Sequence, residues 1–175
     1  MDSHWSDNFN RNGNNHHLDV KSALRNIALF RGFTKSELRS FARIIYVRWY
    51  NENEIIFNEN EPGIGMYIIY KGSVKIFKSS ELNGEEQIST LIKGDFFGEH
   101  SLMEEYPRSA SAIALEDCCL LGMFRPDLLR LVERKPRLGN KIILILAQRI
   151  AARLHQKDEE LLQIKERLTN MDFIR

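Results

Sequence analysis

The spacing of hydrophobic positions changes twice along this chain of 175 residues. Apolar residues recur at helical spacing over residues 19–30, and a capping box at Thr34 predicts a second helix over residues 34–44. Helical spacing returns over residues 127–133, and Pro136 fits the first turn of a long helix to about residue 168. Between these helical regions, short apolar runs separated by turn residues predict strands over residues 44–50, 55–57, 66–70, 74–78, 87–91, 112–115 and 119–124.

This order of elements predicts an α+β fold, with a β-roll or jelly-roll barrel flanked by N-terminal helices and a long C-terminal helix. Many short strands at regular spacing are typical of such a roll, and closure would remove most exposed strand edges. Asn83-Gly84 between two predicted strands indicates a hairpin. We expect a disordered polar tail over residues 1–17, the β-roll with its flanking helices over 18–138, and the long helix over 139–170.

Charge and composition narrow the expected partners. With 25 basic and 24 acidic residues the net charge is +1, so no global basic field favours nucleic acid. No apolar run approaches the length of a membrane span, and no signal core begins the chain, so we expect no membrane partner. The adjacent Cys118 and Cys119 favour a reducing, cytoplasmic location, and alternation along a strand predicts one thiol buried and one nearer the surface.

The densest candidate chemistry lies in residues 98–102 and 107–111. Glu99 precedes Arg108 by nine residues, and a short helical turn between them would bring both side chains to one hollow. Arginine offers a planar fork of donors to phosphate oxygens, a glutamate accepts from a sugar hydroxyl, and Gly98 permits close backbone approach. The set matches a sugar phosphate. From the residues alone, a simple surface ion pair between Glu99 and Arg108 is the alternative.

Residues 93–111 resemble the phosphate-binding cassette of cyclic-nucleotide-binding domains, in particular the effector domains of bacterial catabolite-activator-type regulators. Residues 61–76 resemble the glycine-punctuated hairpin of that family, and residues 114–121 resemble the strand pair after the cassette. The resemblance covers about residues 20–168. It implies cAMP or cGMP as ligand, with cAMP favoured on family grounds, and no metal. Asn60 stands where the family more often has glycine, a departure expected to affect a turn and not the pocket.

The resemblance also implies a role for each cassette residue. Arg108 would neutralise the cyclic phosphate, with Ser109 adding a hydroxyl or backbone donor, and Glu99 would accept from the ribose 2′-hydroxyl. His100 stands where the family usually has an aliphatic residue, and it is expected to be structural. In the bacterial activators, hydroxylated residues of the long helix contact adenine, whereas the matching positions here are Lys157 and Asp158. This difference leaves the base preference open. The expected ligand-binding residues are Phe97, Gly98, Glu99, His100, Ser101, Arg108, Ser109, Ala110, Lys157 and Asp158.

The long helix also carries a heptad pattern over residues 143–168. Opposite charges at positions 153 and 158, and at 160 and 165, would face each other between two parallel chains, which favours a homodimer. Leucine at a with isoleucine at d leans toward tetramers, and a helix whose early part packs on its own roll is a further alternative. The a positions are Ala147, Leu154, Leu161 and Leu168, and the d positions are Ile143, Ile150, Lys157 and Ile164.

We therefore expect a cyclic-nucleotide sensor that signals through its C-terminal helix to an unidentified downstream protein. DNA-binding relatives carry a winged helix-turn-helix after the long helix, whereas this chain ends at Arg175, so no direct DNA binding is expected. The alternatives are a nucleotide-independent interaction scaffold of the same fold and the effector half of a longer transcription regulator. An enzyme is not expected, because His100 is the only histidine of the β region and no nucleophile–base pattern stands out.

Overall fold

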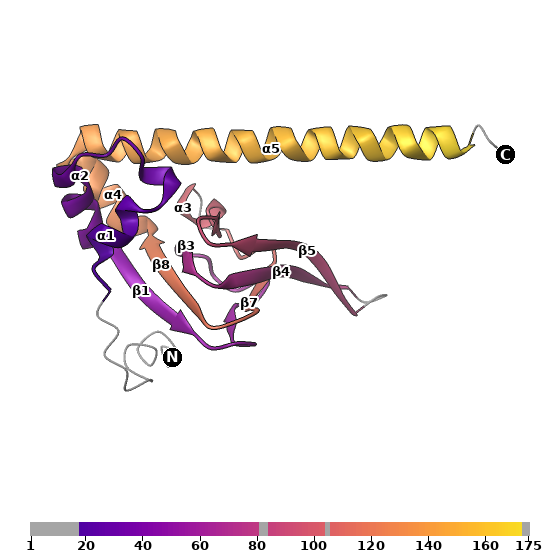
Figure 1. Cartoon of the computed structure of the whole chain (residues 1–175), viewed down its shortest axis with the longest axis horizontal. Helices are drawn as coiled ribbons and strands as arrows, with labels where there is room; N and C mark the ends of the chain where they lie inside the picture. The colour runs from indigo at the N-terminus through magenta and orange to yellow at the C-terminus, as the bar shows by residue number, and fades with distance from the viewer. Residues whose placement is uncertain (1–17, 81–83, 104–105, 173–175) are drawn as a thin grey trace. The chain divides into compact units, whose positions relative to one another are not determined.

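The computed structural model of the chain (Figure 1) describes residues 18–80, 84–103 and 106–172. The predicted tail of residues 1–17 and Asn83 of the predicted Asn-Gly turn lie outside the described residues. The chain divides into two compact units, Met1–Arg130 and Leu131–Arg175. The first unit holds the N-terminal helices and all the strands among the described residues, and the second is mostly one long helix.

The N-terminal helices begin at capping residues. Asp19 caps α1 (Val20–Arg25) through a hydrogen bond from the Lys21 amide at 3.1 Å. The predicted capping box begins α2 (Lys35–Phe41), because the Glu37 amide donates to Thr34 Oγ1 at 3.2 Å and the Thr34 amide donates to the Glu37 carboxylate at 2.7 Å. A single 3₁₀ turn, Ala42–Ile44, continues α2 toward the first strand.

The helix predicted over residues 19–30 is not continuous. Ile27 is extended (φ −90°, ψ 126°), and a separate 3₁₀ turn, Ala28–Phe30, follows it. Ile27, Leu29 and Phe30 are all buried, although residues 27 and 29 would point to different faces of one regular helix. Breaking the helix lets all three apolar side chains enter the core, so packing overrides the helical pattern.

Two antiparallel four-stranded sheets form the β-roll, in the orders β1-β8-β3-β6 and β2-β7-β4-β5. Figure 1 labels β1, β3 and β8 of the first sheet and β4, β5 and β7 of the second. This arrangement confirms the predicted fold class, but the sheets are not closed into a barrel. Two of the four strands at the ends of the sheets, β2 and β6, have only three and two residues. The strands are β1 (Ile45–Tyr50), β2 (Ile55–Phe57), β3 (Gly65–Lys71), β4 (Ser73–Ser80), β5 (Gly84–Ile92), β6 (Phe96–Phe97), β7 (Ser111–Ala114) and β8 (Cys118–Phe124).

The seven predicted strands are all present, and their limits differ from the prediction by at most three residues. The predicted hairpin is confirmed by the pairing of β4 with β5, in which Ser80 lies opposite Gly84. The sequence did not predict β6, because two residues are too few for an alternating pattern. Its residues, Phe96 and Phe97, pair with Ile68 and Tyr67 of β3.

Aromatic side chains fill the interior of the roll next to the candidate cassette. The rings of Tyr67 and Phe97 have centroids 5.6 Å apart, and the ring of Phe57 lies 5.8 Å from that of Phe97. All three rings are buried in one cluster with aliphatic residues of β3, β4, β7 and β8. The cluster therefore forms an apolar floor that both sheets share.

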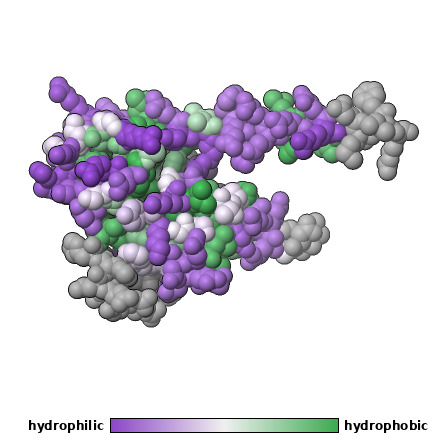
Figure 2. Space-filling view, in the orientation of Figure 1, coloured by the Kyte–Doolittle hydropathy of each residue, from purple (hydrophilic) through white to green (hydrophobic). Residues whose placement is uncertain are grey.

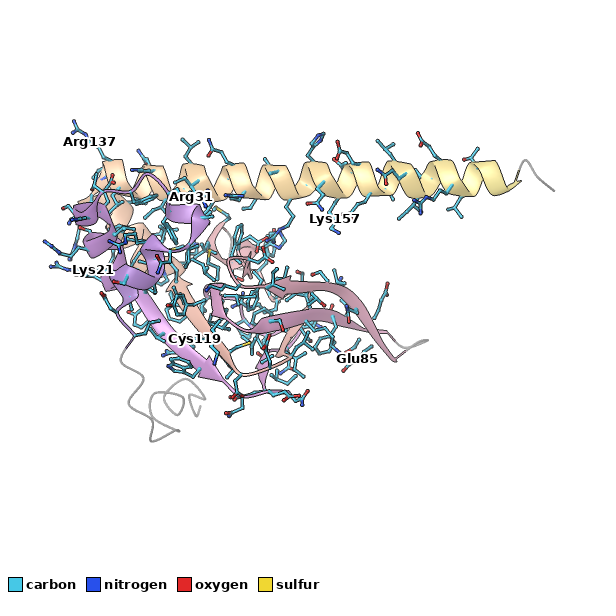
Figure 3. The ribbon with its side chains drawn as sticks, in the orientation of Figure 1. Lys21, Arg31, Glu85, Cys119, Arg137 and Lys157 are labelled. Carbon is cyan, nitrogen blue, oxygen red and sulfur yellow. The ribbon has the colours of Figure 1, made fainter. Side chains whose placement is uncertain are left out.

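Both cysteines are buried, so the prediction that one lies nearer the surface is wrong. They begin β8, which lies between β1 and β3 and is buried on both faces along nearly its whole length. Alternation along a strand separates the two thiols to opposite faces, but here both faces are covered. Figure 3 labels Cys119 within this sheet.

Thiol reactivity gives a direct test of this burial. Burial raises the pKa of the Cys118 thiol and raises the pKa of Cys119 to about 12. We expect both thiols to react with a thiol reagent at pH 8 at least ~100-fold more slowly in the folded protein than in urea, because the thiolate is the nucleophile. An exposed thiol in Asn140→Cys is the control and should react rapidly in the folded protein. Rapid reaction of the folded parent protein would contradict the burial.

The C-terminal helices follow the strands directly. The short helix α4 (Arg125–Arg134) is followed by α5 (Pro136–Asp172), which begins at Pro136 as predicted. Ile142 and Leu146 are buried, whereas large apolar side chains farther along α5 are 50–62% exposed. Figure 2 shows hydrophobic areas within the mostly hydrophilic surface of this helix. These exposed residues are Leu154, Leu161, Leu162, Ile164 and Leu168. Among the described helices, none is both long and apolar enough to cross a bilayer.

Candidate functional site

A short helix joins the two ends of the cassette, as the spacing of Glu99 and Arg108 predicted. The chain leaves β6 at Phe97, and α3 (His100–Met103) begins two residues after Gly98. The Leu102 amide donates to the Glu99 carbonyl at 3.0 Å, which closes the first turn. Glu99 and Arg108, separated by nine residues in the sequence, are both buried.

Gly98 is required here by its backbone conformation and by its neighbours. Its φ is +74°, a left-handed conformation that side chains disfavour. A Cβ atom at residue 98 would collide with Nη1 of Arg108 and would lie 3.3 Å from the Gly65 carbonyl oxygen. The absence of a side chain at residue 98 therefore makes room for the guanidinium.

The Arg108 side chain is only 5% exposed. Its Nη1 donates to the Gly98 carbonyl at 3.2 Å and to Ser101 Oγ at 3.1 Å. The guanidinium carbon lies 4.1 Å from the ring centroid of Phe57, a cation–π contact with the apolar floor. The Nε of Arg108 is also buried, and no described residue accepts a hydrogen bond from it. Among the described residues, Arg108 is therefore a largely dehydrated cation whose hydrogen-bond donors are only partly used.

The backbone of Arg108 is held by the loop between β2 and β3. The Arg108 amide donates to the Glu61 carbonyl at 2.8 Å, and the Asn60 amide donates to the Arg108 carbonyl at 2.9 Å. Asn60 has φ +67°, a left-handed conformation that asparagine tolerates better than most residues. Glycine adopts this conformation readily, which explains why the family that the cassette resembles more often has glycine at this position. The departure at Asn60 was expected to concern only a turn. The structure connects this turn directly to Arg108.

Burial also sets the electrostatics of the site. Desolvation lowers the pKa of the Arg108 guanidinium, because a low-dielectric surrounding disfavours the charged form. Tyr67, Glu61, Tyr50 and Glu99 act in the opposite direction and favour the cation. An anion that binds beside Arg108 would likewise favour the charged guanidinium and would compensate the cost of its desolvation.

The other expected cassette residues differ in exposure. Ser101 is buried and is hydrogen-bonded to Arg108, and Ala110, two residues after Arg108, is also buried. Phe97 belongs to the apolar floor. His100 and Ser109 are exposed. Sequence reasoning missed Phe57, which underlies the guanidinium from a strand about fifty residues earlier. An isolated aromatic residue in a three-residue strand carries no signal that could have identified it.

Lys157 and Asp158 are exposed on α5, in the second unit of the chain (Figure 3 labels Lys157). Lys157 Nζ donates to the Glu160 carboxylate at 2.7 Å within the same helix. Their part in base recognition, which the family resemblance implied, stays a prediction.

Comparisons with known proteins agree with this geometry. The family model described as "Cyclic nucleotide-binding domain" matches residues 47–135 and thus the whole cassette. The chain is 36% identical to the cyclic AMP receptor protein of Thermus thermophilus over 70% of this chain and 56% of that protein. It is 34% identical to human cGMP-dependent protein kinase 2 over 58% of this chain and 14% of the kinase. The chain therefore spans about half the length of the first relative and a small part of the second.

A solved structure supports the same assignment. The cyclic nucleotide-binding domain from Methylobacillus flagellatus superposes with a TM-score of 0.72 and 26% identity, over 82% of this chain and 80% of that one. The residues matched by the family model include both Glu99 and Arg108. The chain belongs to the cyclic nucleotide-binding domain family.

Proposed function

We propose that this protein binds a cyclic nucleotide at the cassette, with the guanidinium of Arg108 neutralising the cyclic phosphate. The observation that carries the proposal is the burial of Arg108 together with its unused Nε donor, for which no described residue is an acceptor. A buried cation with free donors is costly in the absence of an anion. A phosphate would accept from the planar fork of donors and compensate that charge.

The remaining cassette residues have complementary roles in this proposal. Glu99 accepts from the ribose 2′-hydroxyl, which a 3′,5′-cyclic nucleotide leaves free. Gly98 allows close backbone approach, and Ser109 supplies a further hydroxyl or amide donor to the phosphate. Phe97 belongs to the buried aromatic cluster and limits access of water.

We favour cAMP as the ligand, with cGMP as the competing nucleotide. The relative named for cyclic AMP matches 70% of this chain, whereas the one named for cGMP matches 58%. Lys157 and Asp158 remain the candidate contacts to the base, from α5. No metal takes part in this recognition.

Signalling would pass through the C-terminal helix. Residues 18–138 form the binding region in this proposal, and residues 139–170 form the helix that pairs in a homodimer and presents a surface to a downstream protein in the cytoplasm. The exposed leucines of α5 support pairing through residues 143–168. Nucleotide can change this surface only if it binds two arrangements of the domain with different affinity.

A second candidate is the effector half of a longer transcription regulator. The chain matches 56% of the Thermus thermophilus receptor protein, which supports this reading. Both candidates require nucleotide binding, so one experiment tests their common basis.

Isothermal titration of nucleotide-free protein with cAMP, cGMP and 5′-AMP tests the proposal. A low ratio of absorbance at 260 nm to that at 280 nm first shows that no nucleotide has co-purified. We expect micromolar or tighter binding of a cyclic nucleotide and much weaker binding of 5′-AMP, whose phosphate is not cyclic. If neither cyclic nucleotide produces a binding heat, the hypothesis of a nucleotide-independent interaction scaffold replaces that of a nucleotide sensor.

A further inference from the structure

Two buried tyrosines meet inside the roll. Tyr50 ends β1 and Tyr67 lies in β3, and these residues are 7% and 2% exposed. The strand β8 lies between β1 and β3, so the two phenols reach across it to form a side-chain hydrogen bond. Gly122 of β8 lies opposite Tyr67, and a Cβ atom at residue 122 would lie only 3.3 Å from the Tyr67 ring. The absence of a side chain at residue 122 therefore leaves room for this ring.

The hydrogen bond between the two phenols has a direction. Burial raises the pKa of Tyr50, and Tyr67 raises it further through its charge and through the hydrogen bond. A hydrogen bond that favours the protonated phenol is one that this phenol donates, so Tyr50 donates to the Tyr67 oxygen. A phenol hydroxyl can otherwise rotate about its C–O bond. The bond from Tyr50 therefore fixes the orientation of the Tyr67 hydroxyl.

Two sets of contacts place Tyr67 close to Arg108. In the ladder between β3 and β6, Tyr67 lies opposite Phe97, and the next residue, Gly98, accepts the hydrogen bond from Arg108 Nη1. The Tyr67 ring also stacks on the ring of Phe57, with centroids 6.3 Å apart and planes at 23°. The guanidinium carbon lies 4.1 Å from the same Phe57 centroid. The phenol and the guanidinium thus share Phe57 and the β6 end as neighbours.

The electrostatics of Arg108 agree with this placement. Desolvation lowers the pKa of the guanidinium, and among the groups that act against desolvation Tyr67 has the largest effect, ahead of the carboxylates of Glu61 and Glu99. A fixed hydroxyl dipole interacts more strongly with a cation inside a protein than in water, because the local dielectric is low. An oriented Tyr67 hydroxyl can therefore influence where the guanidinium lies.

We infer that Tyr67 is a positioning residue for the Arg108 guanidinium, and that Tyr50 in turn orients the Tyr67 hydroxyl. The hydroxyl dipole stabilises the cation against Phe57, in the orientation in which its remaining donors can meet an anion. This inference rests on the proposed function and adds two tyrosines of the roll to the residues on which it depends. Neither phenol has to touch the nucleotide for this role.

Tyrosine-to-phenylalanine variants test the inference, because each removes one hydroxyl and keeps the ring. Titration calorimetry measures the dissociation constant of the cyclic nucleotide that binds the wild type. We expect Tyr67→Phe to bind it about 10-fold more weakly and Tyr50→Phe about 3-fold more weakly, as for the loss of one hydrogen bond or less. Tyr70→Phe is the matched control and should stay within about twofold of the wild type. Tyr70 lies on the same strand, with its ring centroid 5.7 Å from Lys93 Nζ and outside the buried cluster.

A double-mutant cycle with Arg108→Lys separates positioning from a purely structural role. If Tyr67 acts through the guanidinium, Tyr67→Phe should weaken binding by less than about twofold once Arg108 is replaced by lysine. If the hydroxyl only stabilises the roll, the same loss of about 10-fold would appear in both backgrounds, and that result would overturn the inference. Unchanged affinity in Tyr67→Phe would overturn it as well.

Thermal unfolding of each variant shows whether it is folded. If Tyr67→Phe does not fold, Tyr50→Phe is taken through the same cycle, and an equal loss in both backgrounds again contradicts the inference. Failure of the wild type to bind any cyclic nucleotide would instead overturn the proposed function, and the inference with it.

Discussion

Replacing Arg108 by alanine is expected to weaken cyclic-nucleotide binding by at least about 100-fold. A hydrogen bond to a charged group contributes about 1.5–3 kcal/mol, and each 1.4 kcal/mol is a factor of ten in affinity. The guanidinium would make two or more such bonds to the phosphate, in a site from which water is largely excluded. Titration of the variant with the nucleotide that binds the wild type measures the loss.

Arg39→Ala is the matched control, because Arg39 is exposed on α2 and lies outside the cassette. It should bind nucleotide as the wild type does. Arg108→Lys keeps a positive charge but loses the planar fork, so it should recover only part of the affinity. Because Arg108 is buried, the unfolding temperature of each variant must be measured. Wild-type affinity in a folded Arg108→Ala protein would exclude this residue as the phosphate ligand.

Leu154→Glu combined with Leu161→Glu is expected to convert the proposed homodimer into monomers. Both leucines are exposed on α5, at successive a positions of the heptad pattern, with 62% and 50% of their surface accessible. Burying a carboxylate in a coiled-coil core is unfavourable by several kcal/mol per site, so the dissociation constant should rise by at least ~100-fold. Sedimentation velocity over a range of protein concentrations measures the change.

Leu162→Glu controls for the added charge. Leu162 is 59% exposed but lies one position after the seam, so this variant should remain dimeric. A monomeric wild-type protein at high concentration would contradict pairing through α5. A tetrameric mass would instead agree with the preference of leucine at a and isoleucine at d.

Local sequence signals predicted the features that depend on neighbouring residues. The capping box at Thr34 needs only Glu37 three residues later, and Pro136 needs only the preference of proline for a first helical turn. The strands of the roll followed from short apolar runs between turn residues. The short helix between Glu99 and Arg108 was likewise predicted, because residues close in the sequence determine it.

Long-range packing determined the features that the sequence did not reveal. The predicted N-terminal helix is interrupted at Ile27, because Ile27, Leu29 and Phe30 are all buried in the core. One face of a continuous helix could not bury all three side chains. Cys118 and Cys119 are both buried because β8 is an inner strand with both faces covered. Neither outcome depends on the residues next to these positions.

The candidate site combines both kinds of information. The sequence by itself identified Gly98, Glu99, Ser101 and Arg108 as one group, because their spacing and chemistry belong to a local motif. Only the tertiary structure placed Phe57 under the guanidinium, Asn60 and Glu61 on its backbone, and Gly63 against Ser101. These contacts join segments about 40 to 50 residues apart, and burial and hydrogen bonding between them depend on how the two sheets pack, which no local pattern records.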